Sequence, residues 1–380
     1  VDPTAELYIE AGTVIKGAPG DSTDASVLVV SRGGKLYAEG TGDRPIVFTA
    51  EADDITNPVD VAYDTKGLWG GLIILGNAPI NASGGEDNIE GIPIDARGLY
   101  GGDDAYDCSG VVRYTSIRHG GISIGEGNEI NGLTMGGVGS RTSIEYVEVL
   151  SNLDDGFEWF GGTVNGNHLV AAFCGDDSYD MDQGLVNELE YLFAIQHPDF
   201  GNMLGEHDGA SSSNTAATPV TDATVKYATY LGSGQNSTNG KQEQGLKLRE
   251  NWAGSYTMSI FGDYNGYGVT VSDKYDPDSR DRLEAGDLVL ADNIWFNFNG
   301  YTLADSVGKE DYTAAHLNAN NNMGVDPQLR GISRVQDGGL DPRPVFGGAG
   351  FGKGAFMVTN WAADWSGLYA YGVMGDVTVS

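Results

Sequence analysis

Two segments of the sequence, 22 residues apart, present acidic side chains in nearly the same order. They are NLDDGFEWFGG at 152–162 and CGDDSYDMDQG at 174–184. If the two segments stack, their carboxylates lie about 5 Å apart, where like charges repel unless a proton or a cation compensates them. Ca²⁺ suits such a group of oxygens, because it accepts about six to eight ligands in irregular geometry. The candidate calcium ligands are Asp154, Asp155, Glu158, Asp176, Asp177, Asp180, Asp182 and Asp199.

A simpler interpretation of these acids stays open. Aspartates in turns often accept hydrogen bonds from backbone amides and point into water, with no ion involved. A further step of 22 residues places Asp199 in line with Asp155 and Asp177, so the register predicts where the three lie. A second acidic segment, 273–287, has Asp278 at the position where an EF-hand requires glycine. There we expect a solvated loop whose arginines pair with its acids.

The elements that hold these residues must repeat at the same interval. Short runs rich in Val, Ile, Tyr and Thr follow one another along the chain, and the 58 glycines fit many tight turns between them. The segment 7–17 is echoed 21 residues later, with Leu7 matching Leu28 and Ile9 matching Val30. Such a repeat suits one coil of a parallel β-helix, whereas a sandwich or propeller does not require residue-by-residue stacking. The spacing therefore predicts an all-β parallel β-helix.

The repeat also predicts how the chain is divided. We expect one β-helical domain over 1–380, with insertions near 124–140, 205–223 and 273–287, a short helix near 304–322 and a closing segment at 340–380. In the stacked register Phe157 lies over Tyr179, and we expect these rings to pack inside the coil.

The composition limits the partners. The chain has 54 acids and 21 bases, a net charge of −33, and this surface repels a phosphate backbone, so nucleic acid is not an expected partner. The longest apolar run, GLIIL at 71–75, is far shorter than the roughly 20 residues of a membrane span. Cys108 and Cys174 would bond only in an oxidising compartment, and the sequence leaves their state open.

Several motifs resemble those of a known family. EGIPIDARGLYGG, VVRYTSIRHGG, DDGFEWFGGTV and, near the C-terminus, LDPRPVFGG and NWAADWSGLYAYG occur in this order. The set is similar to a family of large exported bacterial proteins, found in marine Bacteroidetes and some Proteobacteria, and it covers nearly the whole chain. The resemblance implies a right-handed parallel β-helix and export. The N-terminal VDPTAELYIEAG, which looks like a trimmed mature end, fits export as well. The resemblance implies little about chemistry, because the family is mostly of unassigned function.

We expect a secreted or cell-surface protein with a structural or adhesive role and no catalysis. Strand-like segments near residue 6 and at 368–380 leave no evident cap, so copies of the chain could assemble head to tail into filaments. The alternative is a carbohydrate-binding or polysaccharide-lyase-like β-helix, in which the acids hold Ca²⁺ and Arg113, Arg118 or His119 supplies the base. Arg118 and His119, in SIRHGG, could equally form an exposed strand end that turns at two glycines. The expected partners are other copies of the chain or a polysaccharide.

Overall fold

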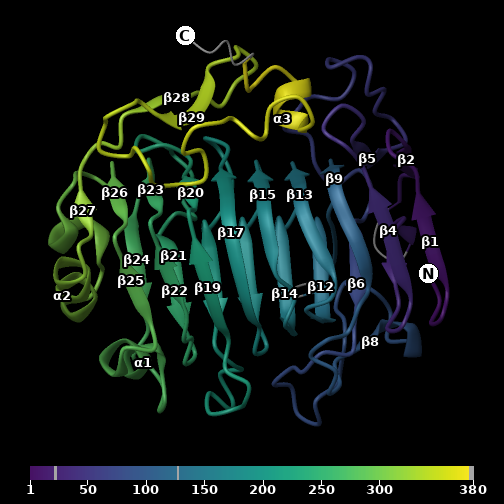
Figure 1. Cartoon of the computed structure of the whole chain (residues 1–380), viewed down its shortest axis with the longest axis horizontal. Coiled ribbons are helices and arrows are strands. Elements are labelled where there is room, and N and C mark those ends of the chain that lie inside the picture. The colour runs from purple at the N-terminus through teal and green to yellow at the C-terminus, as the bar shows by residue number, and fades with distance from the viewer. Residues whose placement is uncertain (21–23, 126–127, 376–380) are drawn as a thin grey trace.

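The computed structural model describes residues 1–20, 24–125 and 128–375, and it shows a parallel β-helix formed by two long sheets (Figure 1). Within each of these sheets neighbouring strands run parallel. The main path of sheet A is β1 (Glu6–Ile9), β4 (Lys35–Glu39), β9 (Gly110–Arg118), β13 (Ser143–Leu150), β15 (Gly166–Ala172), β17 (Val186–Ile195), β20 (Thr229–Leu231), β23 (Ile260–Gly262), β26 (Ile294–Phe296) and β27 (Met323–Gly324). Five more strands extend sheet A: β2 (Val14–Gly17), β5 (Ile46–Ala50), β19 (Asp222–Lys226), β22 (Ser255–Thr257) and β25 (Val289–Ala291). Sheet B follows the order β3 (Leu28–Val30), β6 (Leu72–Leu75), β12 (Leu133–Val138), β14 (Phe157–Gly162), β16 (Tyr179–Asp182), β18 (Gly205–Asp208), β21 (Gln244–Arg249) and β24 (Tyr267–Val271). The predicted all-β parallel β-helix is confirmed.

Shorter elements decorate the coils. Three antiparallel pairs are β7 (Asp87–Asn88) with β8 (Leu99–Tyr100), β10 (Ile122–Gly125) with β11 (Asn128–Ile130), and β28 (Leu329–Ile332) with β29 (Leu340–Pro344). The helical segments are η2 (Ala96–Gly98), α1 (Ser279–Ala285), the π-turn η3 (Leu303–Val307), α2 (Asp311–Ala319) and α3 (Gly367–Ala370). The helix predicted near 304–322 is confirmed by α2.

Helix α1 was not expected, because the acidic segment 273–287 was predicted to be a loop. Its start carries a capping box, in which Asp278 and Asp281 each accept a hydrogen bond from the other's backbone, and Gly286 ends it with a φ of 84°. The arginine pairs expected in this segment are present, for example Arg280 with Asp273 at 2.7 Å. Local capping thus makes a helix of a segment whose composition suggested only a solvated loop.

The 22-residue register holds between β14 and β16. Phe157 pairs with Tyr179 and Glu158 with Asp180, as predicted. The two rings stack inside the coil, with centroids 5.4 Å apart and both side chains fully buried. Cys174 lies buried near them and, like Cys108, is a free thiol.

The register predicted beyond these strands is wrong at two places. From β16 to β18 the step is 26 residues, so Asp180 pairs with Glu206. At the N-terminus β1 pairs with β4 at a step of 29, which places Leu7 beside Leu36 and Ile9 beside Ala38. Strand pairing is fixed by which side chains face inward, whereas the turns absorb extra residues without disturbing it.

Two predicted insertions contain strands of sheet B. β12 lies inside 124–140 and β18 inside 205–223, so only parts of these ranges leave the coil. The glycines of β12 suggested a loop, yet they are needed for packing. A Cβ on Gly136 would come within 2.7 Å of the ring of Tyr100, and Gly137 has a φ of 55°.

The two ends of the β-helix differ. At the N-terminal end β1 and β3 are edge strands, and Tyr8 on β1 is 67% exposed. At the opposite end η3 and α2 cover the last coil and bury Val307 and Leu317 against the core. The predicted absence of a cap is therefore contradicted at this end.

Residues 325–375, named the strap here, return along the side of the molecule. Figure 1 shows this yellow segment, with β28, β29 and α3, passing over the ends of the sheet A strands back to β9. Leu368 and Val373 of the strap are buried in a second core with Leu150 and Ile195 of sheet A. The strand-like terminus predicted at 368–380 is thus wrong up to residue 375, because these side chains pack against sheet A; residues 376–380 lie outside the described part.

Candidate functional site

The outer face of sheet B carries two columns of charged side chains. Residues along a strand alternate between the two faces of a sheet, so each buried side chain is flanked by outward ones. The inward residues include Trp159, Met181, His207 and Leu248, which are at most 1% exposed. The first outward column is Glu158, Asp180, Glu206 and Lys247, and the second is Phe160, Asp182, Asp208 and Arg249. The β-helix therefore aligns acids on β14, β16 and β18, and bases on β21.

Further acids lie in the turns that lead into β14 and β16. The backbone N–H of Asp177 donates to Asp155 Oδ1 at 2.8 Å, and that of Met203 donates to Asp177 Oδ1 at 2.5 Å. Asp155 in turn donates its N–H to Asn131 Oδ1 at 3.2 Å. One oxygen of Asp155 and one of Asp177 thus accept a hydrogen bond from the following coil, as the simpler interpretation proposed, but both side chains are buried and do not point into water.

Carboxylate oxygens of these turns and of β16 converge in two groups. One group is Asp154, Asp155 and Asp176, and the other is Asp155, Asp177 and Asp180; within each, one oxygen per residue lies within 4.8 Å of the others. Asp180 Oδ1 is buried and has no hydrogen-bond partner among the described residues. We call these five aspartates, together with Glu158 and Asp182, the acid cluster.

Burial and mutual repulsion shift the proton affinity of the acid cluster. Burial first, and then the charge of Asp176, raises the pKa of Asp154 to about 7. Burial and the charge of Asp208 raise the pKa of Asp182 to about 8. Glu90, from the loop after β7, has its pKa raised to about 8 by burial and by Asp154. At neutral pH this cluster must bind protons or a cation to relieve its repulsion.

Asp199 does not belong to the acid cluster. Its side chain is 76% exposed and lies 4.0 Å from His197 Nδ1. The prediction placed Asp199 in line with Asp177, but the 26-residue step to β18 puts Met203 at that position. The extra residues of the turn displace Asp199 outward.

The bases of β21 neutralise the acids of β18. Lys247 Nζ lies 2.5 Å from Glu206 Oε1, and Arg249 pairs with Asp208 and lies 3.2 Å from Glu206. Burial alone would lower the pKa of Arg249, but the hydrogen bond and the charge of Asp208 raise it. This part of the face is a compensated ion network, unlike the acid cluster beside it.

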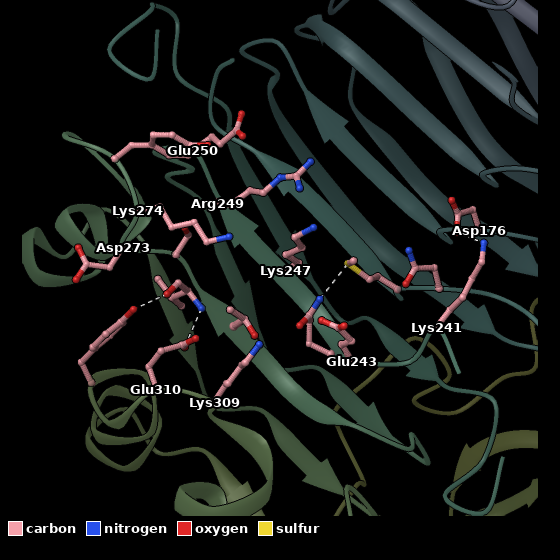
Figure 2. A pocket seen from close by; sticks show the side chains of 18 residues that line it. Asp176, Lys241, Glu243, Lys247, Arg249, Glu250, Asp273, Lys274, Lys309 and Glu310 are labelled. Carbon is pink, nitrogen blue, oxygen red and sulfur yellow. Dashed lines mark hydrogen bonds and ion pairs between the residues drawn. The ribbon is translucent and has the colours of Figure 1, made fainter. Parts of the chain in front are cut away.

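A cavity of about 690 Å³ opens over β21 and β24. Figure 2 shows Lys247 and Arg249 on its floor and Lys274 and Lys309 extending into it from the border. With Lys241 these are five of the 21 bases of the chain. Lys241 pairs with Asp176 at 3.3 Å, whereas the ammonium groups of Lys274 and Lys309 have neither ion pair nor hydrogen bond within the described ranges.

A family model for a pectate-lyase-like β-helix domain matches residues 1–331. The chain belongs to this family. The match spans both sheets, the acid cluster and the cavity, and it ends just inside the strap. A search of curated proteins found no match.

In this pectate-lyase-like domain the predicted bases lie away from the acid cluster. Arg113 is on sheet A, where it pairs with Glu39 at 3.2 Å. Arg118 and His119 are buried beneath the strap, and His119 Nε2 lies 2.8 Å from the hydroxyl of Tyr371. The expectation that these residues act beside the acids, or form an exposed strand end, is contradicted for Arg118 and His119 because the strap covers them.

The bases that do lie on the face were missed. Lys247 and Arg249 alternate with Leu246 and Leu248 in QGLKLRE, which is a clear signal for a strand with one charged face. Lys274 and Lys309 had no such signal, since they come from the turn after β24 and the segment before α2. No helix in the described part of the chain is long and apolar enough to cross a membrane.

Proposed function

We propose that this domain binds an acidic polysaccharide along the outer face of sheet B, in a manner that depends on Ca²⁺. The observation that carries the proposal is that one face holds both the acid cluster, whose only ion pair among the described residues is Lys241 with Asp176, and a cavity bordered by Lys274 and Lys309, which have no ion pair there. A neutral glycan requires neither of these charges. A polyanion approaching a chain of net charge −33 needs cations at its point of contact. On this face the cations would be the lysines of the cavity and a Ca²⁺ held by the acid cluster.

The acid cluster is the proposed Ca²⁺ site. Asp155, Asp177 and Asp180 supply one ligand group, and Asp154 and Asp176 with Asp155 supply the other. Carboxylate oxygens are the ligands that Ca²⁺ prefers, and their unequal spacing suits its flexible coordination. A bound Ca²⁺ would remove the repulsion within the cluster and would leave coordination positions for the carboxylates of a ligand.

Binding without bond cleavage is the form of the proposal that the ion pairs favour. Elimination from a uronate requires a base, and a guanidinium such as Arg249 becomes a poorer base when Asp208 and Glu206 hold it. The role is then adhesive, as expected for a secreted or cell-surface protein. Extracellular modules commonly use calcium sites of modest affinity, which agrees with such a location.

The test measures binding to polygalacturonate, alginate and a neutral glucan, each with Ca²⁺ and with a chelator. We expect the acidic polymers to bind only with Ca²⁺ and the glucan not to bind. Asp180→Asn should weaken binding at least tenfold. Asp199→Asn, which changes the same residue type outside the cluster, is the control and should have no effect. Equal binding with and without Ca²⁺, or equal loss in both variants, would refute the calcium-dependent site.

A second candidate is self-association through the N-terminal end. Among the described strands β1 pairs with β4 alone, and such an edge favours pairing with another strand. The outer edge of β3 is already occupied, because Val1 donates to Val29 O at 2.5 Å and accepts from the N–H of Ser31 at 3.0 Å. Because η3 and α2 cover the opposite end, two copies would meet by their N-terminal ends as a dimer rather than head to tail as a filament. Light scattering over a range of concentrations tests this candidate, and a mass that stays monomeric at high concentration excludes it.

A further inference from the structure

The cavity over β21 and β24 is closed on one side. Beyond β24 the stack continues as η3 and α2 in place of another strand of sheet B. Gly308 bridges to Val269, and Glu310 and Tyr312 both bond the backbone of Val271, at 3.1 and 2.6 Å. The segment around Lys309 is therefore fixed to the last strand and forms the border of the cavity.

The turn after β24 forms the adjoining border. The backbone N–H groups of Lys274 and Tyr275 donate to Asp278 Oδ2 at 2.6 and 3.1 Å, which holds the turn in place. Arg280 of α1 pairs with Asp273 and lies 4.6 Å above the ring of Tyr312. This contact joins the two borders at the β24 end of the cavity, and the other end of the cavity reaches Asp176 of the acid cluster.

The charges that line the cavity are unequally engaged, and of its acids Glu243 has no ion pair among the described residues. Asp176 is paired with Lys241, Asp273 with Arg280, and Glu310 accepts hydrogen bonds from Val271 and Thr313. Burial, and the charge of Asp208, raise the pKa of Glu250 to about 7, which reduces its negative charge. The ammonium groups of Lys274 and Lys309 remain unpaired within the described residues, and Figure 2 shows both directed into the same space. Such a pair of compact cations fits an oxyanion.

We propose that Lys274 and Lys309 form a subsite for the carboxylate or sulfate of a terminal sugar, so that the domain recognises the end of an acidic chain. This inference rests on the proposed function, because the polymer would enter from the acid cluster along sheet B. The segments that carry Lys274 and Lys309 border the cavity at its β24 end, where sheet B stops, and this makes the terminal residue the natural occupant. The substrate class is thereby an anionic glycan with a free end.

The experiment compares short and long fractions of polygalacturonate by calorimetry in the presence of Ca²⁺. Recognition of ends predicts a fixed number of protein molecules per polymer chain, whatever its length. The double variant Lys274→Met, Lys309→Met should bind at least tenfold more weakly. The double variant Lys274→Arg, Lys309→Arg keeps both positive charges and should retain most of the affinity. Lys226→Met on sheet A is the matched control and should bind as the wild type does. Equal melting temperatures establish that each variant is folded.

The outcomes separate the two proposals. If the number of bound molecules grows with chain length, recognition of ends is wrong while polysaccharide binding stands. If the double methionine variant binds as tightly as the wild type, the lysine subsite is refuted while polysaccharide binding stands. If no acidic polymer binds, the proposed function fails, and inorganic sulfate then tests the lysines alone. Sulfate should raise the melting temperature of the wild type more than that of the double variant, and an equal rise refutes the subsite.

Discussion

Glu158, Asp180 and Asp182 of the acid cluster lie on β14 and β16 at outward positions equivalent to those of the ion network on β18 and β21, yet the charges of the two regions are balanced in opposite ways. Lys247 and Arg249 neutralise Glu206 and Asp208 within hydrogen-bond distance. In the part of the chain that the structure describes, the acid cluster has no ion pair with a base apart from that of Lys241 with Asp176. Because the inward side chains are equally buried in both regions, the difference lies in the outward residues alone. The scaffold can therefore change its binding chemistry without changing its core.

The largest expected effect is the loss of stability when a buried side chain is truncated beneath either region, and it tests whether the core is equally well packed under both. Phe157→Ala beneath the acid cluster and Leu248→Ala beneath the ion network should each lower the free energy of unfolding by about 3 kcal/mol or more, since both side chains are fully buried. Chemical denaturation measures this loss. A cost below about half a kcal/mol for either variant would show that its side chain does not pack inside.

The next effect tests the ion network. Arg249→Met should lower the free energy of unfolding by about 1 to 2 kcal/mol, because it leaves Asp208 buried without its partner. The cost stays below that of a fully buried pair because the Arg249 side chain is 31% exposed. Lys226→Met, measured in parallel, should cost much less. If the two variants are equally stable, the network contributes nothing and the contrast with the acid cluster fails.

The smallest effect is a pH dependence that arises in the acid cluster. The pKa of Asp154 rises from 3.8 to about 7 and that of Glu90 from 4.5 to about 8, both chiefly by burial. Between about pH 4 and pH 8 the folded chain therefore holds protons that the unfolded chain has released, so stability falls as the pH rises. With a chelator, we expect a lower melting temperature at pH 8 than at pH 5. Added Ca²⁺ should reduce this difference, and a profile unaffected by Ca²⁺ would contradict the metal site.

The sequence predicts those parts of the structure that depend on strand periodicity. The stacking of Phe157 on Tyr179 follows from alternation and a constant 22-residue step, and both hold there. The step to β18 changes to 26, and turn lengths of this kind leave no periodic signal, which is why Asp199 was misplaced. The position of Lys309 on the same cavity as Lys274 depends on how η3 and α2 close the last coil. This arrangement depends on packing between segments that are distant in the sequence, so the sequence of neither segment predicts it.

The strap gives this β-helix a property that simple repeat proteins lack. Coils that contact only their neighbours can fray one at a time from an open end. Here Glu148 on β13 accepts a hydrogen bond from the backbone N–H of Leu368 at 3.1 Å, across 220 residues of sequence, and Ser116 on β9 also bonds to Glu148. A segment synthesised after the coils thus fastens coils made long before it, so this part of the native state forms only once the strap has been synthesised. Once it is packed in place, the strap links early and late coils, so these coils unfold cooperatively.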